Sequence, residues 1–216
     1  MNKKKILKIV GIILLIIIIL FLAHTIRNYI IIRDLQNKIT RYSNSTNYHI
    51  KSIATEENGT IVTMEYYKKD EKQALFMERN LNGEISKTLM YNNGKRTDSF
   101  IETQNEKIAH LDSGTMMSIS IYNQLETDNN WQTFFSSIFT KIKSTKYEEK
   151  DCYVITGFLS NTSLTEKETE IFIDKGTGLV LKVKQNGIIT EKEYEFDNVD
   201  SSIFVEPDIS QYTLKK

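Results

Sequence analysis

The sequence predicts an α+β protein, in which an open, curved antiparallel β-sheet with covering helices follows an N-terminal transmembrane helix. Three observations predict this fold. Residues 6–23 form an apolar run with one charge, and most of the later chain alternates with the two-residue period of strands. Between two groups of such strands, residues 131–142 repeat with the period of a helix. We therefore expect a single domain behind one membrane anchor.

The apolar run ILKIVGIILLIIIILFLA has the length and composition of a membrane span. As a helix it is about 27 Å long, close to the ~30 Å hydrocarbon core. Its one charge, Lys8, lies near the end, where the side chain can reach the interface. A cleaved signal peptide is the competing interpretation. It is disfavoured because the run is long and because Phe21-Leu22-Ala23 places bulky residues where a cleavage site needs small ones.

The chain divides into a cytoplasmic tail at residues 1–5, a signal anchor at 6–24 and an extracytoplasmic domain at 25–216. Three lysines precede the span, whereas only Arg27 and Arg33 follow it closely, so the positive-inside rule places the N-terminus in the cytoplasm. The helix continues as an amphipathic segment at about 32–42, with apolar residues at Ile32, Leu35, Ile39 and Tyr42. We expect the domain to sit close to the bilayer.

Short strands joined by tight turns account for residues 48–112, and further strands for residues 152–196. In the last strand, Thr190, Lys192, Tyr194 and Phe196 face one side and a row of acidic residues faces the other. The tail, which holds the single proline, Pro207, reads as a loop docking across the sheet. The helix between the strand groups has Asn130 as its expected N-cap. We expect its apolar face to lie over the sheet. This face consists of Trp131, Phe134, Phe135, Ile138, Phe139 and Ile142.

The segment FIDKGTGLVLKV could be a phosphate-binding loop or the turn of a hairpin. A P-loop needs its lysine after the second glycine and a helix behind it, but Lys175 precedes both glycines and a strand-like run follows. A hairpin turn explains the same residues, since one glycine can take a positive φ. The sequence therefore predicts a hairpin motif formed by Asp174, Gly176, Thr177, Gly178 and Leu179.

Nothing in the sequence favours catalysis, a cofactor or a metal. The three histidines, His24, His49 and His110, have no second histidine or cysteine at ligand spacing. Cys152 lies in an apolar strand, as a buried small hydrophobe would. With 28 basic and 28 acidic residues, the net charge of zero gives no reason to expect nucleic acid as a partner. We predict a binding protein that is not an enzyme and has no cofactor.

The order of motifs resembles the bacterial lipoprotein carrier superfamily, the LolA and LolB type half-barrels, and in particular the membrane-anchored branch of Gram-positive bacteria of the Firmicutes type. The resemblance covers residues 32–216 and is carried by DLQNKI before the first strand, EKDCYVITG after the aromatic helix, IFIDKGTGLVLKV, EKEYEFDNV and FVEPDISQY. Two departures stand out. An anchor replaces the cleaved signal or lipidated cysteine, and the family's residues for handing on cargo have no match here.

The resemblance implies an unclosed barrel whose concave face holds a lipid, an acyl chain or a lipoprotein. Its implied partners are the membrane, a lipid or acylated protein, and an envelope protein. Residues that could line or cover such a ligand are Trp131, Phe134, Phe135, Ile138, Phe139, Ile142, Tyr194 and Phe196. For any single one of them, the sequence alone favours a place in the core. The alternative function is a non-enzymatic envelope sensor or regulatory interaction subunit with a self-filled sheet.

Overall fold

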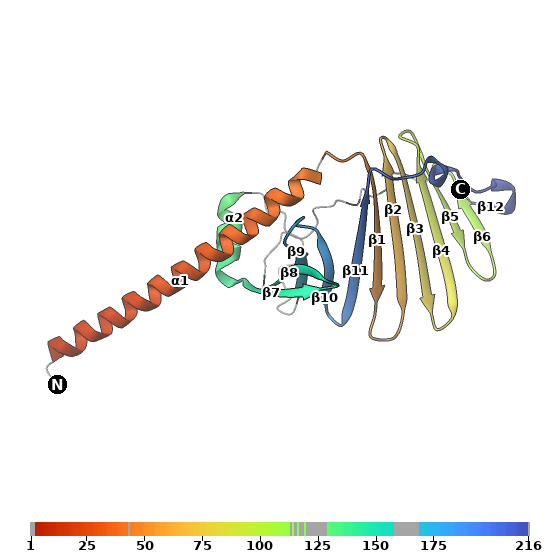
Figure 1. Ribbon diagram of the computed structural model, residues 1–216. Helices are drawn as coiled ribbons and strands as arrows, with labels where there is room; N and C mark the ends of the chain where they lie inside the picture. The colour runs from red at the N-terminus through yellow and green to blue at the C-terminus, as the bar shows by residue number, and fades with distance from the viewer. Residues whose placement is uncertain are drawn as a thin grey trace.

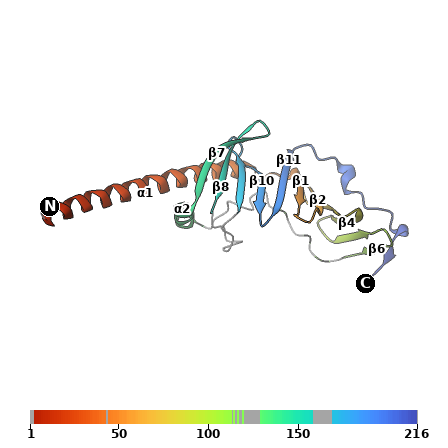
Figure 2. The same cartoon turned by 90° about the horizontal axis from the view of Figure 1, so that it is seen from below.

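The computed structural model describes residues 3–42, 44–112, 114, 116, 119, 129–157 and 169–215. A long helix, α1, leads into an open curved sheet, and a short helix, α2, lies beside α1 (Figures 1 and 2). The described strands of the sheet number twelve, in the order β12-β6-β5-β4-β3-β2-β1-β11-β10-β9-β8-β7. All described neighbours pair antiparallel except β12, which runs parallel to β6. The predicted fold class, an open antiparallel sheet behind an apolar helix, is confirmed.

The described strands form two groups, one before α2 and one after it. The first group follows α1 (Lys3–Ile39) and the 3-10 turn η1 (Thr40–Tyr42), and comprises β1 (Asn47–Thr55), β2 (Ile61–Lys69), β3 (Lys72–Leu81), β4 (Glu84–Asn92), β5 (Thr97–Glu102) and β6 (Lys107–His110). The second follows α2 (Asn130–Phe139) and comprises β7 (Lys141–Tyr147), β8 (Lys150–Thr156), β9 (Glu170–Asp174), β10 (Val180–Gln185), β11 (Ile188–Phe196) and β12 (Thr213–Leu214), with 3-10 turns η2 (Ser201–Phe204) and η3 (Ile209–Gln211) between the last two strands. Pairing of β11 with β1 joins the groups.

α1 changes its surroundings along its length. Its large apolar side chains from Ile6 to Leu22 are all exposed, whereas Ile32, Leu35 and Ile39 are buried. Ile32 and Leu35 pack against side chains of the second strand group, namely Ile142, Ile155, Ile171, Ile173, Val180 and Val183. We call the side of the sheet that carries these residues the helix-covered face. Among the described residues, α1 is the one helix long and apolar enough to span a membrane.

The helix α2 departs from the prediction in its limits and its orientation. It ends at Phe139, its N-cap is Asn129 and not Asn130, and Ile142 belongs to β7. β7 pairs with β8 from end to end, so Ile142 fits the helical period only by coincidence. The aromatic face was expected to lie over the sheet. Instead α2 packs on α1, where Phe134 meets Tyr29 edge-on at 5.9 Å, and the buried residues of α2 are the small polar Thr133, Ser136 and Ser137.

The C-terminal tail docks across the opposite face of the sheet, as the sequence predicted. Ile203, Phe204 and Tyr212 pack against a cluster formed by Ala74, Tyr91, Phe100 and Ala109. The Tyr212 ring meets the Phe100 ring edge-on at 5.1 Å, and β12 adds to β6. The tail therefore covers the edge of the sheet that is farthest from α1.

The tail contact should weaken in acid. The Tyr212 hydroxyl donates a hydrogen bond to Glu102, and this bond, supported by Lys107, holds the pKa of Glu102 below its ordinary value of 4.5. A lowered pKa in the folded state means stability that is present above pH 4.5 and lost as the pH falls through the folded pKa. We expect Tyr212→Phe to reduce the pH dependence of unfolding below pH 4.5, measured by denaturation at a series of pH values. Equal slopes for both proteins would contradict the assignment.

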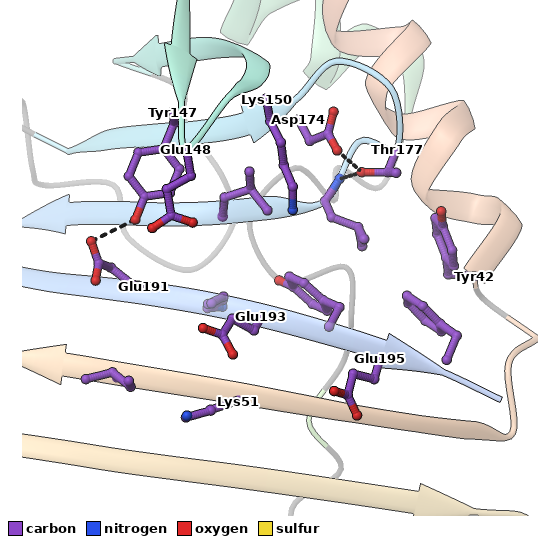
Figure 3. Close-up of a pocket in the computed structure, with 16 residues that line it drawn as sticks. Tyr42, Lys51, Tyr147, Glu148, Lys150, Asp174, Thr177, Glu191, Glu193 and Glu195 are labelled. Carbon is purple, nitrogen blue, oxygen red and sulfur yellow. Dashed lines mark hydrogen bonds between the residues drawn. The ribbon is translucent and has the colours of Figure 1, made fainter. Parts of the chain in front are cut away.

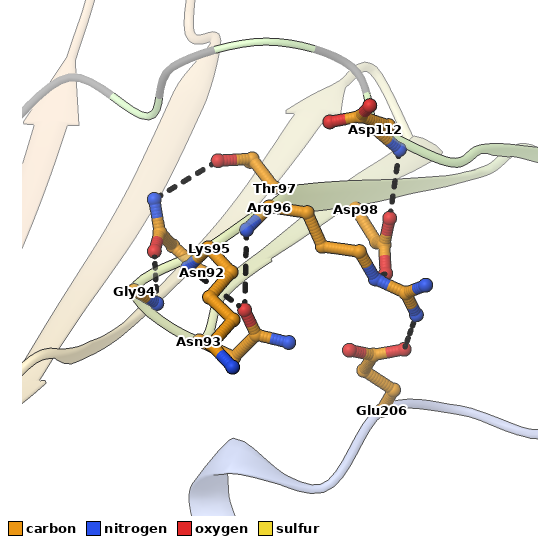
Figure 4. A network of polar contacts seen from close by, with 9 residues as sticks. All are labelled: Asn92, Asn93, Gly94, Lys95, Arg96, Thr97, Asp98, Asp112 and Glu206. Carbon is orange, nitrogen blue, oxygen red and sulfur yellow. Dashed lines mark hydrogen bonds and ion pairs between the residues drawn. The ribbon is translucent and has the colours of Figure 1, made fainter.

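Arg96, which pairs with the buried carboxylate of Asp98, connects the turn between β4 and β5 to the tail (Figure 4). Asp98 is fully buried, lies 2.8 Å from Arg96 Nε, and accepts the backbone N–H of Asp112 at 2.8 Å. Arg96 also reaches Glu206 of the tail at 3.8 Å. Burial and then Asp98 raise the pKa of Glu206. Arg96 thus lies between two carboxylates and holds them together.

We expect Arg96→Gln to destabilise the fold by about 2 kcal/mol. The substitution leaves Asp98 buried without its counter-charge, which is costlier than the loss of a surface pair, although the half-exposed arginine reduces the effect. Chemical denaturation measures the change, and Lys95→Gln on the same turn is the matched control. An equal stability loss in both variants would show that Asp98 does not need Arg96.

Candidate functional site: a cavity between β10 and β11

The neighbouring strands β10 and β11 are paired along only part of their length. Pairing runs from Lys182 opposite Glu191 to Gln185 opposite Ile188, and the register of β10 against β9 shifts between Val180 and Lys182. Beyond this point β11 remains paired with β1. The opening is bridged by the hydroxyl of Tyr194, which donates to the carbonyl of Val180 at 2.9 Å. A cavity of about 490 Å³ lies here (Figure 3), a size typical of ligand sites.

One part of the cavity lining is apolar. Tyr42, at the end of the α1–η1 unit, stacks on Phe196 of β11 with the ring centroids 4.5 Å apart. Leu179 and Leu181 line the cavity from the β10 side. The 3-10 turn η1 after α1 and the long strand β11 therefore form this wall together.

The remaining lining is mostly charged and polar: Lys51, Ile53, Tyr147, Glu148, Lys150, Asp174, Thr177, Glu191, Lys192, Glu193, Tyr194 and Glu195. Glu191 accepts hydrogen bonds from Lys182 at 2.7 Å and from the Tyr147 hydroxyl at 2.8 Å, and these partners, in that order, lower the pKa of Glu191. Burial and then Glu191 raise the pKa of Tyr147, which therefore stays protonated. Glu191 is thus already satisfied by the chain.

Lys192 differs from the other charged residues of the lining. It lies opposite Ser52 of β1, is mostly buried, and burial lowers its pKa. Within the part of the chain that the structure describes, no acidic group is paired with it and it donates no hydrogen bond. A mostly buried ammonium beside an apolar wall is costly unless an anion meets it. The arrangement suits an amphiphile with a negative head.

The predicted hairpin motif forms one corner of the cavity. Asp174 accepts the N–H of Gly176 at 2.7 Å and the hydroxyl of Thr177 at 3.0 Å, and its carbonyl accepts the N–H of Gly178 at 2.8 Å. The segment joins β9 to β10 with no helix behind it. The side chain of Asp174 therefore bonds within the turn, whereas the backbone N–H and carbonyl of Lys175 bond to Asp151 and Lys38 outside it. Thr177 and Leu179 contribute to the lining.

Only some of the predicted ligand-lining residues meet at this cavity. Tyr194 and Phe196 do, whereas Ile142 is in the core. Trp131, Phe134, Phe135, Ile138 and Phe139 are on α2, and none of them lines the cavity. Sequence reasoning missed Tyr147, Glu148 and Lys150, because β7 was not predicted and its turn into β8 could not be placed. The ligand-lining role of any residue stays a prediction.

The described residues offer neither a metal-ligand cluster nor an activated thiol. Among the described residues, no three His, Cys, Asp or Glu side chains gather in a way that could hold a metal ion. The thiol of Cys152 is buried, and burial followed by Asp174 raises its pKa, which keeps it out of the reactive thiolate form.

Comparisons with known proteins find distant structural likenesses. No protein-family model and no curated protein matches the sequence. An uncharacterized conserved protein from Thermus thermophilus is 11% identical, with a TM-score of 0.47 over 85% of this chain and 98% of its own. MucB, solved in complex with MucA(peri), is 14% identical with a TM-score of 0.37 over 81% of this chain and 59% of its own.

A LolA superfamily protein from Nitrosomonas europaea is also similar, with 10% identity and a TM-score of 0.25 over 81% of this chain and 97% of its own. At these levels the likeness concerns architecture only. The structural neighbours of this chain include LolA-superfamily proteins, the group that the sequence resembles.

Proposed function

We propose that this chain is a membrane-tethered, extracytoplasmic binding protein for an anionic amphiphile: an acyl chain carrying a carboxylate or phosphate, free or as part of a lipid or acylated protein. α1 is the uncleaved anchor, with its N-terminus in the cytoplasm. The cavity between β10 and β11 is the binding site. The observation that carries the proposal is the meeting there of an apolar wall with Lys192, a mostly buried cation that has no ion-pair partner among the described residues.

Two features support the tether. The apolar side chains from Ile6 to Leu22 are exposed along the whole segment and need a non-aqueous environment. The same helix continues into the core through Ile32 and Leu35, so the anchor and the domain share one rigid element. By helical rise, Tyr42 in the cavity wall lies about 29 Å beyond Ala23 along the axis of α1.

The ligand's acyl chain packs against Tyr42, Leu181 and Phe196, and its anionic head meets Lys192. Lys51 and Lys150 line the same cavity and favour negative charge at its rim. Acidic residues of β11 oppose them, so a ligand with a single small anionic group fits better than a polyanion.

The test is a titration of the full chain, held in amphipol, with palmitate, its uncharged methyl ester and a lysophosphatidylglycerol, followed by native mass spectrometry. We expect both anions to bind, and the ester to bind roughly tenfold more weakly because it lacks the charge-assisted contact. Equal binding of ester and acid, or no binding of any of the three, would reject the proposal. Binding of palmitate alone would restrict the head group to a carboxylate, and binding of lysophosphatidylglycerol alone would restrict it to a phosphate.

A second candidate is a regulatory interaction subunit of the envelope. The observation that favours it is the filling of the helix-covered face under α1 by the chain's own side chains, including Ile155 and Ile173, both fully buried. Photo-crosslinking in native membranes from the exposed acidic face of β11 tests it. A discrete protein adduct would support this function, and its absence together with ligand binding would favour the first.

A further inference from the structure

The short helix α2 exposes large aromatic side chains and buries small polar ones. Trp131, Phe135 and Phe139 are 72%, 58% and 69% exposed, while Thr133, Ser136 and Ser137 are buried. A helix on a water-soluble domain is expected to bury its aromatic face. Three large aromatic side chains on one exposed helix face form a patch that indicates a binding surface.

The buried face of α2 packs against α1 in the manner of membrane helices. The side-chain nitrogen of Asn28 on α1 donates to the carbonyls of Ser137 at 3.2 Å and Thr140 at 2.7 Å. The hydroxyls of Ser137 and Thr140 bond to carbonyls of their own helix, each at 2.7 Å. Small residues with internally satisfied hydroxyls allow two helices to approach closely, and they are typical of contacts within bilayers.

The position of α2 along α1 matches the edge of the bilayer. Asn28 lies five residues beyond Ala23, the end of the apolar run, which is about 7.5 Å along the helix axis. Interfacial helices bury their apolar face about 5–10 Å into the boundary between headgroups and acyl chains, and tryptophan is enriched at this boundary. α1 still exposes large apolar side chains at this level, since Ile26 and Ile30 are 49% and 60% exposed.

Charge at the same level fits a lipid surface. Arg27 on α1 and Lys141 just after α2 are exposed, where lipid phosphates would lie. The aromatic patch lines neither the cavity between β10 and β11 nor the grooves near Arg79 and near Phe76. The helix that carries the patch lies beside α1, as Figure 1 shows.

From these observations we infer that α2 is a second membrane contact: an interfacial helix that inserts Trp131, Phe135 and Phe139 into the outer leaflet at the headgroup boundary. This inference rests on the proposed role of α1 as an anchor. A single spanning helix can rotate about its own axis, whereas a second contact on one side of it stops that rotation. α2 thereby fixes which way the half-barrel faces the bilayer.

The test uses Trp131, which is the one tryptophan in the chain and therefore reports on α2 directly. The full chain is reconstituted in vesicles of phosphatidylcholine and phosphatidylglycerol whose acyl chains carry bromine at a shallow or a deep position. We expect blue-shifted Trp131 emission and stronger quenching by the shallow bromines. Trp131 emission typical of water, with quenching by aqueous iodide, would overturn the inference.

Two variants and one extraction separate the roles of the two helices. Phe135→Ser combined with Phe139→Ser should abolish the blue shift without unfolding the protein, because both side chains are exposed, whereas Val205→Ser, also 69% exposed but on the tail, should not change it. Resistance to carbonate extraction tests α1 separately. A carbonate-resistant protein with water-exposed Trp131 overturns the inference and leaves the tether standing, while an extractable protein overturns both.

Discussion

Gly178→Ala should destabilise the domain by about 3 kcal/mol or more, the largest stability loss that we expect from one methyl group in this chain. Gly178 has φ +77°, a conformation that is strained for any residue with a Cβ. A Cβ there would lie 2.6 Å from the carbonyl oxygen of Leu35 and 3.2 Å from the backbone nitrogen of Ile39. Both are backbone atoms of α1, so no side chain can move aside.

The matched control is Gly176→Ala on the same turn. Gly176 is exposed, and an added Cβ would meet only a side-chain oxygen of Asp174 at 3.3 Å. We expect a change of about a few tenths of a kcal/mol, measured by denaturation of the full chain in detergent micelles. Similar losses for both variants would mean that the hairpin does not depend on its close contact with α1.

Lys192→Met should raise stability and reduce ligand binding in the same protein. Burial lowers the pKa of Lys192, so its charge opposes folding at every pH below the folded pKa, and stability should rise as the pH rises through that value. Methionine keeps much of the packing and removes the charge, which should stabilise the fold by on the order of 1 kcal/mol. The loss of a charged contact should weaken binding of palmitate roughly 10- to 100-fold.

Lys184→Met is the control for this pair of effects. Lys184 lies on β10, is 44% exposed, and pairs with Glu170 at the surface. Neither stability nor binding should change measurably. If Lys192→Met weakened folding and binding together, Lys192 would be a structural residue and the proposed anionic head would lose its partner.

Much of the sheet could be predicted because its information is local. The alternation of β11 predicted that Tyr194 and Phe196 face away from the acidic row, and the burial along β11 follows that pattern. The Gly-containing turn between Asp174 and Leu179 was predictable from the spacing of its residues. Lys141–Tyr147 was missed as a strand because Ile142 happened to extend a helical series.

The cavity could not be predicted, because it depends on how strands that are far apart in the sequence pair with one another. It exists because β10 and β11 diverge after a register shift near Val180, which no local pattern encodes. Orientation of α2 could not be predicted for a different reason. The rule that aromatic faces are buried assumes water, whereas in our inference the exposed face of α2 meets lipid.

The most direct measurement of the central claim is photolabelling of the full chain with a diazirine-bearing fatty acid, followed by peptide mapping. We expect labels on three segments that meet at the cavity: Tyr42, residues 179–181 and residues 194–196. Excess palmitate should remove them, and Lys192→Met should reduce them. Labels confined to α2, or to the groove of about 450 Å³ near Phe76 and Leu89 farther along the sheet, would contradict a binding site between β10 and β11.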